Sequence, residues 1–474
     1  MSEHRLHLFN TLTRQNEPLT DTEGSSFKLY TCGPTVYNVA HIGNFRTFLF
    51  EDLLRRTLLL FGNSVEQVMN ITDVDDKTIR GATEKKVPLS EYTAEYKRDF
   101  FEDLDTLRIQ RAEHYPEATA HIQDMIEMIS TLEKKGLAYL HSDGSVYFSI
   151  SKFPSYGKLS HLNLEELRPT AQNFGDEYSH EGIADFALWK AYDKERDGDV
   201  FWESPWGKGR PGWHLECSVM AQKFLGETID LHAGGVDLIF PHHENEIAQS
   251  EGSTGKPFAR HWAHAEHLLV DHKKMSKKLG NFYTLRDLLE KEFSPCAIRY
   301  FLMSTHYRTQ LNFTFEGLDS ALKSIKRIRD FAERLDLAEP GETSTEFKTE
   351  LEQYKDRFYT ALSHDLNINE ALSALFEFIR HTNALLDNNQ LDSSQIELSK
   401  AFLNTVDSIL DILKPEEESL PEQIQSLVEE RSRARMEKNW AKSDEIRNQI
   451  QALGYNIEDL PTGQRLYKLS PKKT

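Results

Sequence analysis

The chain has 474 residues and a mass of 54.8 kDa, more than one compact core usually holds, so we expect about two to four domains. Acidic residues outnumber basic ones by 76 to 56, and the net charge of −20 excludes a histone-like protein or a general duplex binder. A nucleic-acid partner would have to meet a local basic face.

The three cysteines, Cys32, Cys217 and Cys296, are too few for a disulfide framework and indicate a reducing compartment. The first ten residues carry mixed charge and no apolar segment, so the sequence predicts no secretory signal. No apolar run approaches the about 18 residues that a membrane-spanning helix requires. We therefore expect a cytoplasmic, multidomain enzyme without a membrane partner.

Residues 27–71 follow the order strand, loop, helix, strand, which is typical of a parallel α/β sheet. Phe27–Cys32 has the pattern of a strand and runs into a turn at Gly33-Pro34. The segment FRTFLFEDLLRRTLLLFG (45–62) has apolar side chains at helical spacing and ends in glycine, so it predicts an amphipathic helix. Val65–Ile71 predicts the second strand.

The pattern changes twice further along the chain. Helical segments dominate to about residue 140, and residues 141–210 predict an insertion of short strands and loops. The parallel sheet is expected to resume at Gly212. Its predicted strands are Ile229–His232 and His267–Val270, and its predicted helical pieces are Met220–Leu225 and His243–Ser250.

The last third is predominantly helical. Apolar residues recur at helical spacing from residue 283 to 413, which is typical of a helix bundle. The segment KPEEESLPEQ (414–423) predicts a linker. Residues 424–474 predict a small unit with two helices, broken at Trp440, and a less regular tail.

The segment His41-Ile42-Gly43-Asn44 lies where the first predicted strand leads into the first predicted helix. Backbone N–H groups at a helix N-terminus carry partial positive charge and bind phosphate oxygens. Gly43 would allow close approach of a base or ribose, and His41 and Asn44 can donate hydrogen bonds to phosphate. Taken alone, such a tetrapeptide is more often an ordinary loop.

A second signal lies far downstream, after the predicted strand His267–Val270. The segment DHKKMSKKLGNF places Lys274, Lys277 and Lys278 around Met275-Ser276 in one loop. Such lysines can neutralise a triphosphate while negative charge builds up during nucleotidyl transfer. A basic segment alone is usually solvated surface, but together with the earlier loop it indicates a nucleotide site.

With these two segments the sequence resembles the class I aminoacyl-tRNA synthetases: His41–Asn44 matches their HIGH signature and Lys274–Lys278 their KMSKS signature. Four further segments are similar to the cysteinyl-tRNA synthetase family in particular: CGPTVYN (32–38), ITDVDDK (71–77), RPGWHLECS (210–218) and FPHHENEIAQS (240–250). The similarity runs in one register from near residue 5 to near residue 465. Asn44 and Lys278 depart from the last positions of the two signatures; Asn44 keeps a hydrogen-bond donor and Lys278 adds charge.

Pattern and resemblance together imply an α/β fold: a doubly wound, Rossmann-like parallel sheet with an insertion, then an α-helical bundle and a small C-terminal domain. The catalytic domain is expected in two halves, 1–140 and 211–282, the second with the KMSKS-like loop, separated by the insertion or connective peptide at 141–210. The stem-contact region with the helix bundle is expected at 283–413, and the anticodon-binding domain at 424–474.

The resemblance also implies roles for the residues of the nucleotide and amino-acid sites. Charge stabilisation in catalysis is expected from His41, Asn44, Lys274 and Lys277. The same four residues, together with Gly43, are expected to bind ATP, which brings Mg²⁺. The residues expected to surround the cysteine substrate are Gly33, Thr72, Trp213 and Asp237.

Two of the three cysteines lie in the similar segments, and they suggest a metal site. His242 and Glu246 are four residues apart, so a helix would place them on one face. Together with Cys32 and Cys217 they make an acceptable zinc set, although buried cysteines are commonly plain packing residues and His243 competes with His242. The resemblance implies that Cys32, Cys217, His242 and Glu246 bind one Zn²⁺ per chain. Cys296, in an apolar helical segment, is expected to pack in the core.

A zinc ion would explain the choice of amino acid. Zn²⁺ acidifies and binds a thiol, whereas the hydroxyl of serine has too high a pKa to bind comparably. An apolar pocket distinguishes such near-isosteres by only about 10²-fold, so a metal–sulfur bond would remove the need for an editing domain. The short insertion agrees with this.

The C-terminal segment carries a local basic signal: Arg431, Arg433, Arg435 and Lys438 lie close together, near Trp440. Guanidinium groups suit phosphates and base edges and an exposed tryptophan can stack on a base, although a charge-rich helix is normally solvated surface. The resemblance implies contacts with the tRNA anticodon for Arg435, Trp440, Asp444 and Asp459. Leu466 stands where relatives often carry tryptophan, so that stacking contact would be lost or taken by Tyr467.

The resulting hypothesis is a monomeric enzyme that ligates L-cysteine to tRNA(Cys) with ATP, through a cysteinyl-adenylate. The nearest alternative is a cysteine ligase that passes the adenylate to an amino sugar, but such relatives lack the final domain. A non-catalytic RNA- or metal-binding relative would predict eroded signature lysines, whereas Lys274 and Lys277 are both present.

Overall fold

The computed structural model describes residues 4–19, 26–161, 185–414, 422–436, 438–460 and 463–468, and every structural statement below refers to these. The chain divides into two compact units, Met1–Lys414 and Pro415–Thr474, which are described separately. Most of the predicted linker 414–423 lies outside the described residues.

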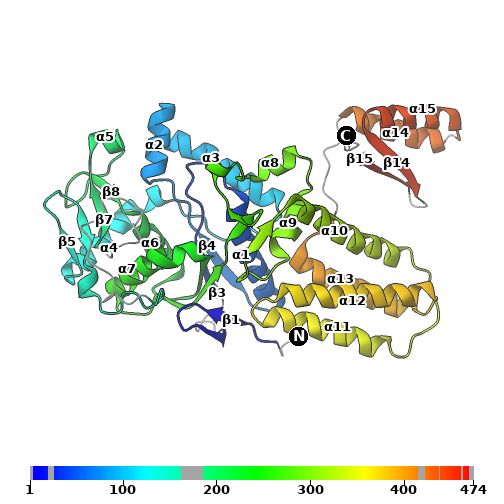
Figure 1. Ribbon diagram of the computed structural model, residues 1–474, viewed down its shortest axis with the longest axis horizontal. Coiled ribbons are helices and arrows are strands. Elements are labelled where there is room, and N and C mark those ends of the chain that lie inside the picture. Colours follow the sequence, from blue (N-terminus) through cyan, green and yellow to red (C-terminus); the bar gives the residue numbers. More distant parts are fainter. Residues whose placement is uncertain are drawn as a thin grey trace. The chain divides into compact units, whose positions relative to one another are not determined.

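The centre of the larger unit is a four-stranded parallel sheet with the order β10-β9-β3-β4 (Figure 1). The strands are β3 (Phe27–Thr31), β4 (Val65–Met69), β9 (Ile229–Gly235) and β10 (Ala259–Ala265). The chain passes from β3 through α1 (Ile42–Leu60) to β4 on one side, whereas β9 lies on the other side of β3 and connects through α7 (Glu244–Thr254) to β10. The strand order therefore reverses between β3 and β9, where sheets of this kind bind ligands.

The sheet is covered on both faces, as its buried strands require. Successive residues of β3 point to opposite faces, so Leu29 packs into the hydrophobic core around α1, and Tyr30 packs into a second core with α6 (Trp213–Leu225). All seven residues of β9 are buried. The predicted doubly wound α/β fold is confirmed.

The predicted helix at 45–62 is also confirmed, but it begins earlier, at Ile42. His41 and Asn44 form a reciprocal capping box that starts the helix. Phe61 and Gly62 follow its last turn, with Gly62 at φ +87.

The insertion contains an antiparallel sheet of order β5-β6-β7-β8, made of Ala138–Leu140, Val146–Phe148, Phe186–Ala191 and Gly209–Pro211. Residues 162–184 lie outside the described residues. The neighbouring helices are α2 (Asp76–Lys85), α3 (Leu89–Thr106), α4 (Ile122–Lys134) and α5 (Lys194–Asp197). Buried Lys190 and Arg210 from the insertion both bond to Asp76, the first residue of α2, and this ties the insertion to that helix.

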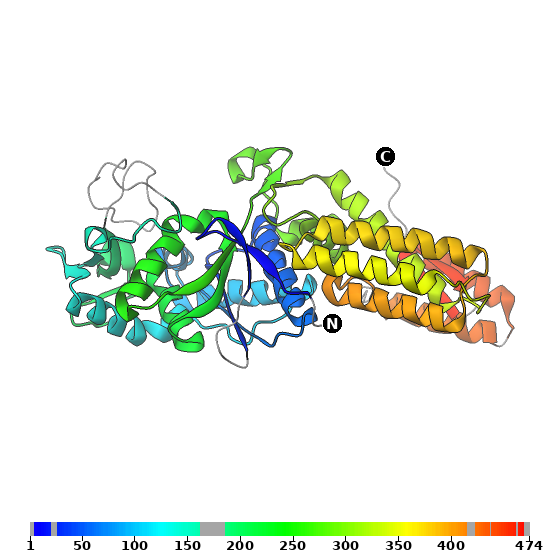
Figure 2. The same ribbon diagram turned by 90° about the horizontal axis from the view of Figure 1, so that it is seen from below.

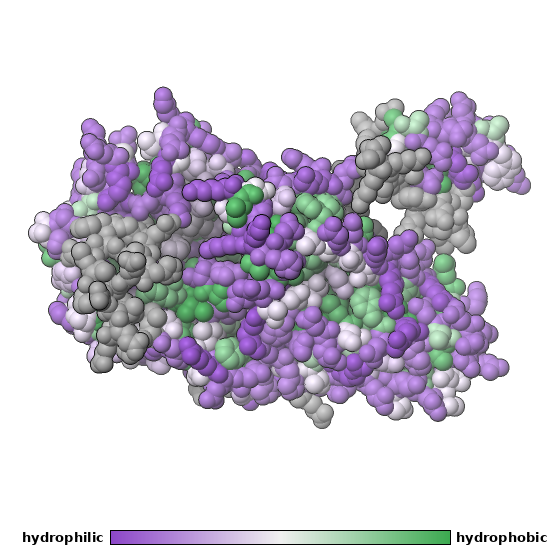
Figure 3. Space-filling view, viewed as in Figure 1, coloured by the Kyte–Doolittle hydropathy of each residue, from purple (hydrophilic) through white to green (hydrophobic). Residues whose placement is uncertain are grey.

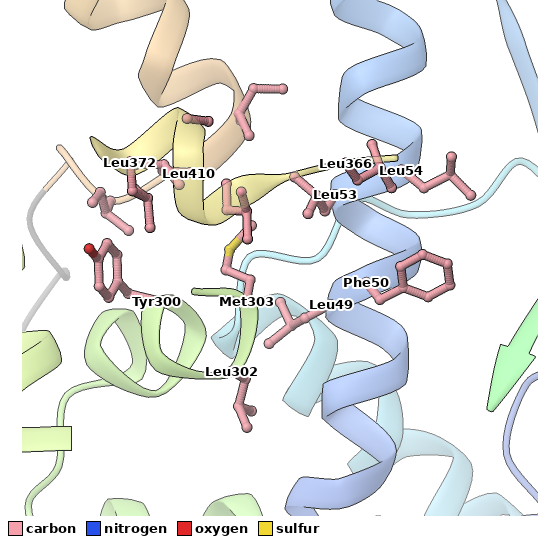
Figure 4. Close-up of a cluster of buried hydrophobic side chains, with 14 of the residues drawn as sticks. Leu49, Phe50, Leu53, Leu54, Tyr300, Leu302, Met303, Leu366, Leu372 and Leu410 are labelled. Atoms are coloured by element: carbon pink, nitrogen blue, oxygen red, sulfur yellow. The ribbon is translucent and has the colours of Figure 1, made fainter. Parts of the chain in front are cut away.

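The helical third follows through α8 (Leu285–Glu290), α9 (Pro295–Met303), α10 (Phe315–Asp336), α11 (Phe347–Ser363), α12 (Ile368–Asp387) and α13 (Ser393–Leu410). Figures 1 and 2 show α11, α12 and α13 lying side by side. Leucines of α1 and residues of α9 gather with Leu366, Leu372 and Leu410 of the helical part in one apolar cluster (Figure 4). Cys296 is buried in this core, as predicted.

Two parts of the predicted strand pattern were wrong. Leu268–Val270 (β11) is not in the main sheet but pairs with β12 (Lys273–Lys274) and β13 (Leu311–Phe313). The strand of the main sheet is instead β10, with the sequence ARHWAHA. Its histidines make the segment look too polar for a buried strand, because their buried partners, such as His243 for His264, come from elsewhere in the chain. An N-terminal hairpin, β1 (His7–Asn10) and β2 (Gln15–Pro18), was not predicted.

The smaller unit contains α14 (Glu422–Met436), α15 (Trp440–Ala452), β14 (Tyr455–Leu460) and β15 (Gly463–Lys468). The predicted break near Trp440 is confirmed. The predicted irregular tail was wrong, because β14 and β15 pair as an antiparallel hairpin. Ile446, Ile450 and Ile457 form its small core.

The face of the molecule seen in Figure 3 is predominantly hydrophilic, with hydrophobic residues in small separate patches. Among the described residues, every helix is too short or too polar to cross a membrane.

Glu51 of α1 is a buried carboxyl group whose two oxygens have no hydrogen-bond partner among the described residues. Burial raises the pKa of Glu51 well above its ordinary value near 4.5. The folded protein therefore keeps a proton on Glu51 at pH values where the unfolded chain has released it.

This difference makes stability depend on pH, because rising pH favours the state that binds fewer protons, here the unfolded one. From about pH 4.5 upward, the free energy of unfolding should fall by at most about 1.4 kcal/mol per pH unit through Glu51, until the folded carboxyl ionises. Glu51→Gln should lack this part of the decline. Urea unfolding between about pH 5 and pH 8 measures it.

The exposed Glu84, replaced in Glu84→Gln, is the matched control and should follow the wild type. Identical pH profiles for the wild type and Glu51→Gln would contradict the prediction.

Candidate functional site

A cleft of about 360 Å³ lies at the carboxyl ends of β3 and β9. Its walls come from the loop after β3, the start of α1, the start of α6, the segment after β9 and the loop that leads to α8. Of the residues predicted for the site, those that line the cleft are Cys32, Gly33, His41, Asn44, Trp213, Asp237 and Lys277. Segments far apart in the sequence thus meet in one cleft.

His41 is held at the N-terminus of α1 in one orientation. The backbone N–H of Asn44 donates to His41 Nδ1 over 3.1 Å, and Asn44 Oδ1 accepts from the His41 backbone N–H over 3.1 Å. Burial lowers the pKa of His41 below its ordinary value. The Lys277 cation also lowers this pKa, whereas a backbone hydrogen bond and the Asp237 carboxylate raise it by less. The ring is therefore neutral near pH 7, and because Nδ1 accepts, its proton is on Nε2 and is available to a ligand.

The two signature segments touch each other. The ring of Phe282 lies edge-on to His41 at 5.3 Å between centroids, and Lys277 Nζ lies 5.0 Å from the centre of the same ring. The backbone N–H of Ile42 donates to the carbonyl of Tyr283 over 3.0 Å. This contact fixes the downstream loop against the start of α1.

Gly43 lies against both the His41 ring and Met275 of the downstream loop. A Cβ atom there would be 3.0 Å from the His41 ring and 3.1 Å from Met275 Cε. A larger residue would therefore push the histidine and the downstream loop apart.

The lysines of the downstream loop are not equivalent. Lys277 begins the short helix η5 (Lys277–Leu279) and lines the cleft. Lys274 lies in β12, is exposed and is not among the lining residues; Lys278 is exposed as well. Asn281 closes the loop, since its Oδ1 accepts from the Ser276 N–H over 2.8 Å and its Nδ2 donates to the Lys274 carbonyl over 3.2 Å.

Three of the four residues predicted to surround the amino acid line the cleft. Gly33 lies against the Asn70 backbone, where a Cβ atom would come within 1.8 Å of the carbonyl oxygen. Trp213 is the first residue of α6, and Asp237 lies in η3 (Val236–Leu238). Thr72 is buried behind the lining, where its hydroxyl donates to Glu216 Oε2 over 2.8 Å.

The four predicted metal ligands form one buried cluster. Cys32, Cys217, His242 and Glu246 each offer a donor atom, and all four donor atoms lie within 4.8 Å of one another. Cys32 follows β3, and Cys217 is in α6. His242 is in the turn η4 (Ile239–His243), just before α7, and its Nε2 is 3.1 Å from Glu246 Oε1.

The charges of this cluster suit a cation. Burial would raise the pKa of Cys217, but the Cys32 hydrogen bond and His242 lower it to about 6. Burial also opposes ionisation of Glu246, yet His232 and His242 lower its pKa to about 2. His242 supplies the compensating proton, since Glu246 and Cys217 raise its pKa to about 10 against the effect of burial. A divalent cation would replace this proton and leave His242 neutral, and two sulfurs, an imidazole and a carboxylate fit Zn²⁺.

A second possible donor set shares two members and contains Cys32, His232, His243 and Glu246. His242 and His243 are held in the same way: His242 Nδ1 is 2.9 Å from His214 Nδ1, and His243 Nδ1 is 2.8 Å from His264 Nε2. Each histidine thus turns its Nε2 toward the cluster, that of His242 to 3.1 Å from Glu246 Oε1 and that of His243 to 3.3 Å from Cys32 Sγ. The set with His242 contains both cysteines, and two sulfur donors fit Zn²⁺ better than one.

The sequence reasoning missed the histidines behind the ligands: His214, His232 and His264. Such partners orient metal ligands and their neighbours. A signal was present, because seven of the 19 histidines fall between His232 and His272. No sequence spacing reveals which of them pair.

The smaller unit contains the residues predicted to contact the anticodon. Trp440 is 57% exposed, and the Arg435 guanidinium lies 5.7 Å from its ring. Asp444 is exposed on α15, and Asp459 lies in β14. Arg431 is fully buried, so the expected surface cluster is smaller than the sequence suggests. The side chains of Asp459, Leu466 and Tyr467 lie outside the described part of the structure.

Comparison with known families divides the chain into three matches. Residues 18–323 match the family described as "tRNA synthetases class I (C) catalytic domain". Residues 357–414 match the "DALR domain", and residues 417–466 match the "Cysteinyl-tRNA ligase anticodon binding domain".

Solved structures with a similar fold have low sequence identity. A methionyl-tRNA synthetase of Mycobacterium tuberculosis in complex with methionyl-adenylate has a TM-score of 0.61 at 14% identity, over 82% of this chain and 90% of that one. A putative arginyl-tRNA synthetase of Campylobacter jejuni has a TM-score of 0.54 at 12% identity, over 83% and 93%. These likenesses support the class I fold alone.

Relatives of high identity extend over the whole chain. A cysteine–tRNA ligase of Protochlamydia amoebophila is 54% identical, over 99% of this chain and 100% of its own. One of Chlamydia felis is 53% identical, over 99% of both chains. The family resemblance found in the sequence is confirmed: the chain belongs to the cysteine–tRNA ligase family.

Proposed function

We propose that this chain attaches L-cysteine to tRNA(Cys) with ATP, through a cysteinyl-adenylate. The observation that carries the proposal is that residues of both nucleotide signatures line one cleft together with Cys32, a member of the possible metal-donor cluster. Hydrolysis of ATP alone would need no such donor set beside the phosphate-binding residues.

In the first step, a carboxylate oxygen of cysteine attacks the α-phosphorus of ATP. The bond to the bridging oxygen breaks, and pyrophosphate leaves with the electron pair, so no side chain has to act as nucleophile. His41 Nε2–H and the side-chain Nδ2–H of Asn44 donate to the phosphate oxygens, and the positive end of the α1 dipole favours the anion there. Lys277 neutralises the charge that develops as pyrophosphate leaves, and Mg²⁺ accompanies the ATP.

Cys32, Cys217, His242 and Glu246 would hold the zinc ion. When bound, it supplies a soft Lewis acid that prefers a thiolate to the hydroxyl of serine. Of these four residues only Cys32 lines the cleft, so the side chain of the substrate would enter beside it, near Trp213 and Gly33. Trp213 lies 4.3 Å from the His242 ring and limits the space around the cluster.

In the second step, the terminal adenosine of the tRNA attacks the carbonyl carbon of the adenylate through its 2′-hydroxyl, and AMP leaves. The smaller unit would recognise the anticodon, with Trp440 stacking on a base beside Arg435. The match of residues 417–466 to an anticodon-binding domain favours tRNA over an amino sugar as the acceptor. We place the reaction in the cytoplasm, where the three free, buried cysteines stay reduced.

Replacing Lys277 tests the nucleotide site. Lys277→Ala should lower cysteine-dependent ATP–pyrophosphate exchange by about 10²- to 10³-fold, since it removes a charge used mainly in the transition state. Zinc content should not change. Lys278→Ala in the same loop is the matched control, because Lys278 does not line the cleft, and an equal loss in both variants would refute the role of Lys277.

Replacing a predicted ligand tests the metal site. Cys217→Ser should reduce bound zinc from one ion per chain to nearly none, measured by metal analysis of the purified protein, and weaken cysteine binding by at least about tenfold. Cys296→Ser, which changes a buried cysteine outside the cluster, should retain the metal. Full zinc content in Cys217→Ser would exclude the assigned ligand set.

Removing the smaller unit tests its role. A chain ending at Lys414 keeps the whole larger unit, so it should form the adenylate within about threefold of the wild type. Its kcat/KM for tRNA should fall by about 10²-fold or more, since stacking on a single base is worth about 1–3 kcal/mol. Pyrophosphate exchange and tRNA charging measure the two steps, and similar losses in both would speak against an anticodon module.

A further inference from the structure

The cleft has a second wall that adenylate formation leaves unused. Tyr37, in the loop after β3, and Lys77, in the first turn of α2, both line it. Lys77 Nζ lies 5.5 Å from the centre of the Tyr37 ring, and Tyr37 is 38% exposed. The ammonium group thus lies over a partly exposed aromatic ring at the cleft.

The backbone beneath Lys77 is firmly held. Asp75 caps α2, where its Oδ1 accepts from the Thr78 N–H over 2.6 Å, and Thr78 Oγ1 accepts from the Asp75 N–H over 2.8 Å. Asp76 accepts from two buried cations of the insertion, Lys190 and Arg210. The residue before Lys77 is therefore locked to the insertion, while the Lys77 side chain itself is exposed.

Tyr37 is fixed to the same structure. The hydroxyl of Tyr92, on α3, donates to the Tyr37 carbonyl over 2.7 Å. Tyr92 reaches this carbonyl across Gly81 of α2, where a Cβ atom would come within 2.1 Å of the Tyr92 hydroxyl. Helices α2 and α3 thus hold Tyr37 and Lys77 as one preformed platform.

The order of the sheet places the two lysines of the cleft apart. Lys77 follows β4, on one side of β3, whereas Lys277 follows β10, beyond β9 on the other side. Cys32, beside which the amino acid enters, follows β3 itself, between the two. The cleft therefore has a second cationic wall, at Lys77, besides the one that Lys277 supplies for ATP.

We propose that Tyr37 and Lys77 form the subsite for the 3′-terminal nucleotide of the tRNA, with the base stacked on the Tyr37 ring and its phosphate paired with the Lys77 ammonium. This inference rests on the proposed function. Aromatic stacking combined with a nearby cation is the usual way to hold an unpaired nucleotide. Stacking needs only the ring, so the Tyr37 hydroxyl has no part in it.

The test pairs changes in the protein with a change in the tRNA. Dissociation constants are measured for a tRNA(Cys) transcript with its complete 3′ end and for one lacking the terminal adenosine. In the wild type, the truncation should weaken binding by about tenfold, the size of a contact with one stacked nucleotide. In Lys77→Gln and Tyr37→Ala, removing the terminal adenosine should change the dissociation constant much less, because the side chain that would contact this nucleotide has already been removed.

Two further variants make the result specific. Tyr37→Phe should behave as the wild type, and so should Lys86→Gln, which removes the same charge at the other end of α2, outside the cleft. In Lys77→Gln, kcat/KM for charging of complete tRNA should fall about tenfold more than that for cysteine-dependent pyrophosphate exchange.

Two results would overturn the subsite: an equal effect of the truncation in the wild type and both variants, or equal losses in charging and exchange for Lys77→Gln. Equal losses would instead assign Lys77 to ATP. Absence of cysteine-dependent exchange in the wild type would refute the proposed function itself, which keeps the two failures distinct.

Discussion

The buried negative charge of Glu246 is the constraint around which the site is arranged. A carboxylate enclosed on all sides is costly unless positive charge lies against it, and here His232 and His242 both bond to it. Cys32 and Cys217 add sulfur donors from two other segments. A divalent cation would satisfy all four donors at once, and if it prefers sulfur, as Zn²⁺ does, it would link the folding of this cluster to the proposed choice of cysteine.

The parallel sheet brings this cluster to the nucleotide. Cys32 directly follows β3, and His41 caps α1 nine residues later, so a single strand–loop–helix unit carries a proposed metal ligand and a proposed phosphate-binding residue. The downstream signature joins them through backbone and ring contacts with Tyr283 and Phe282. Specificity and activation are therefore coupled by short, rigid connections.

The helical part is anchored to the same helix. Buried Asp52 of α1 bonds to Arg299 of α9 over 2.7 Å and to Arg56 over 2.8 Å, and Arg299 also donates to the carbonyl of Leu410 at the end of α13. Residues of the apolar cluster in Figure 4 come from the same helices, among them Leu53 of α1, Leu302 of α9 and Leu410 of α13. Helix α1 thus begins at the cleft and packs against the helical part, so the position of the cleft is fixed relative to these helices.

Local patterns in the sequence determined the strand–loop–helix unit at 27–71, the helices of the last third and the family, because these rest on neighbouring residues and on motifs with fixed spacing. The same patterns missed β10 and the hairpin of β14 and β15, since strands rich in polar residues depend on partners elsewhere in the chain. Only the tertiary structure decided that His214 and His264 stand behind His242 and His243, that Thr72 lies behind the lining of the cleft and that Lys274 lies outside it. Those distinctions are set by hydrogen bonds between residues far apart in sequence, whose pairing no local period encodes.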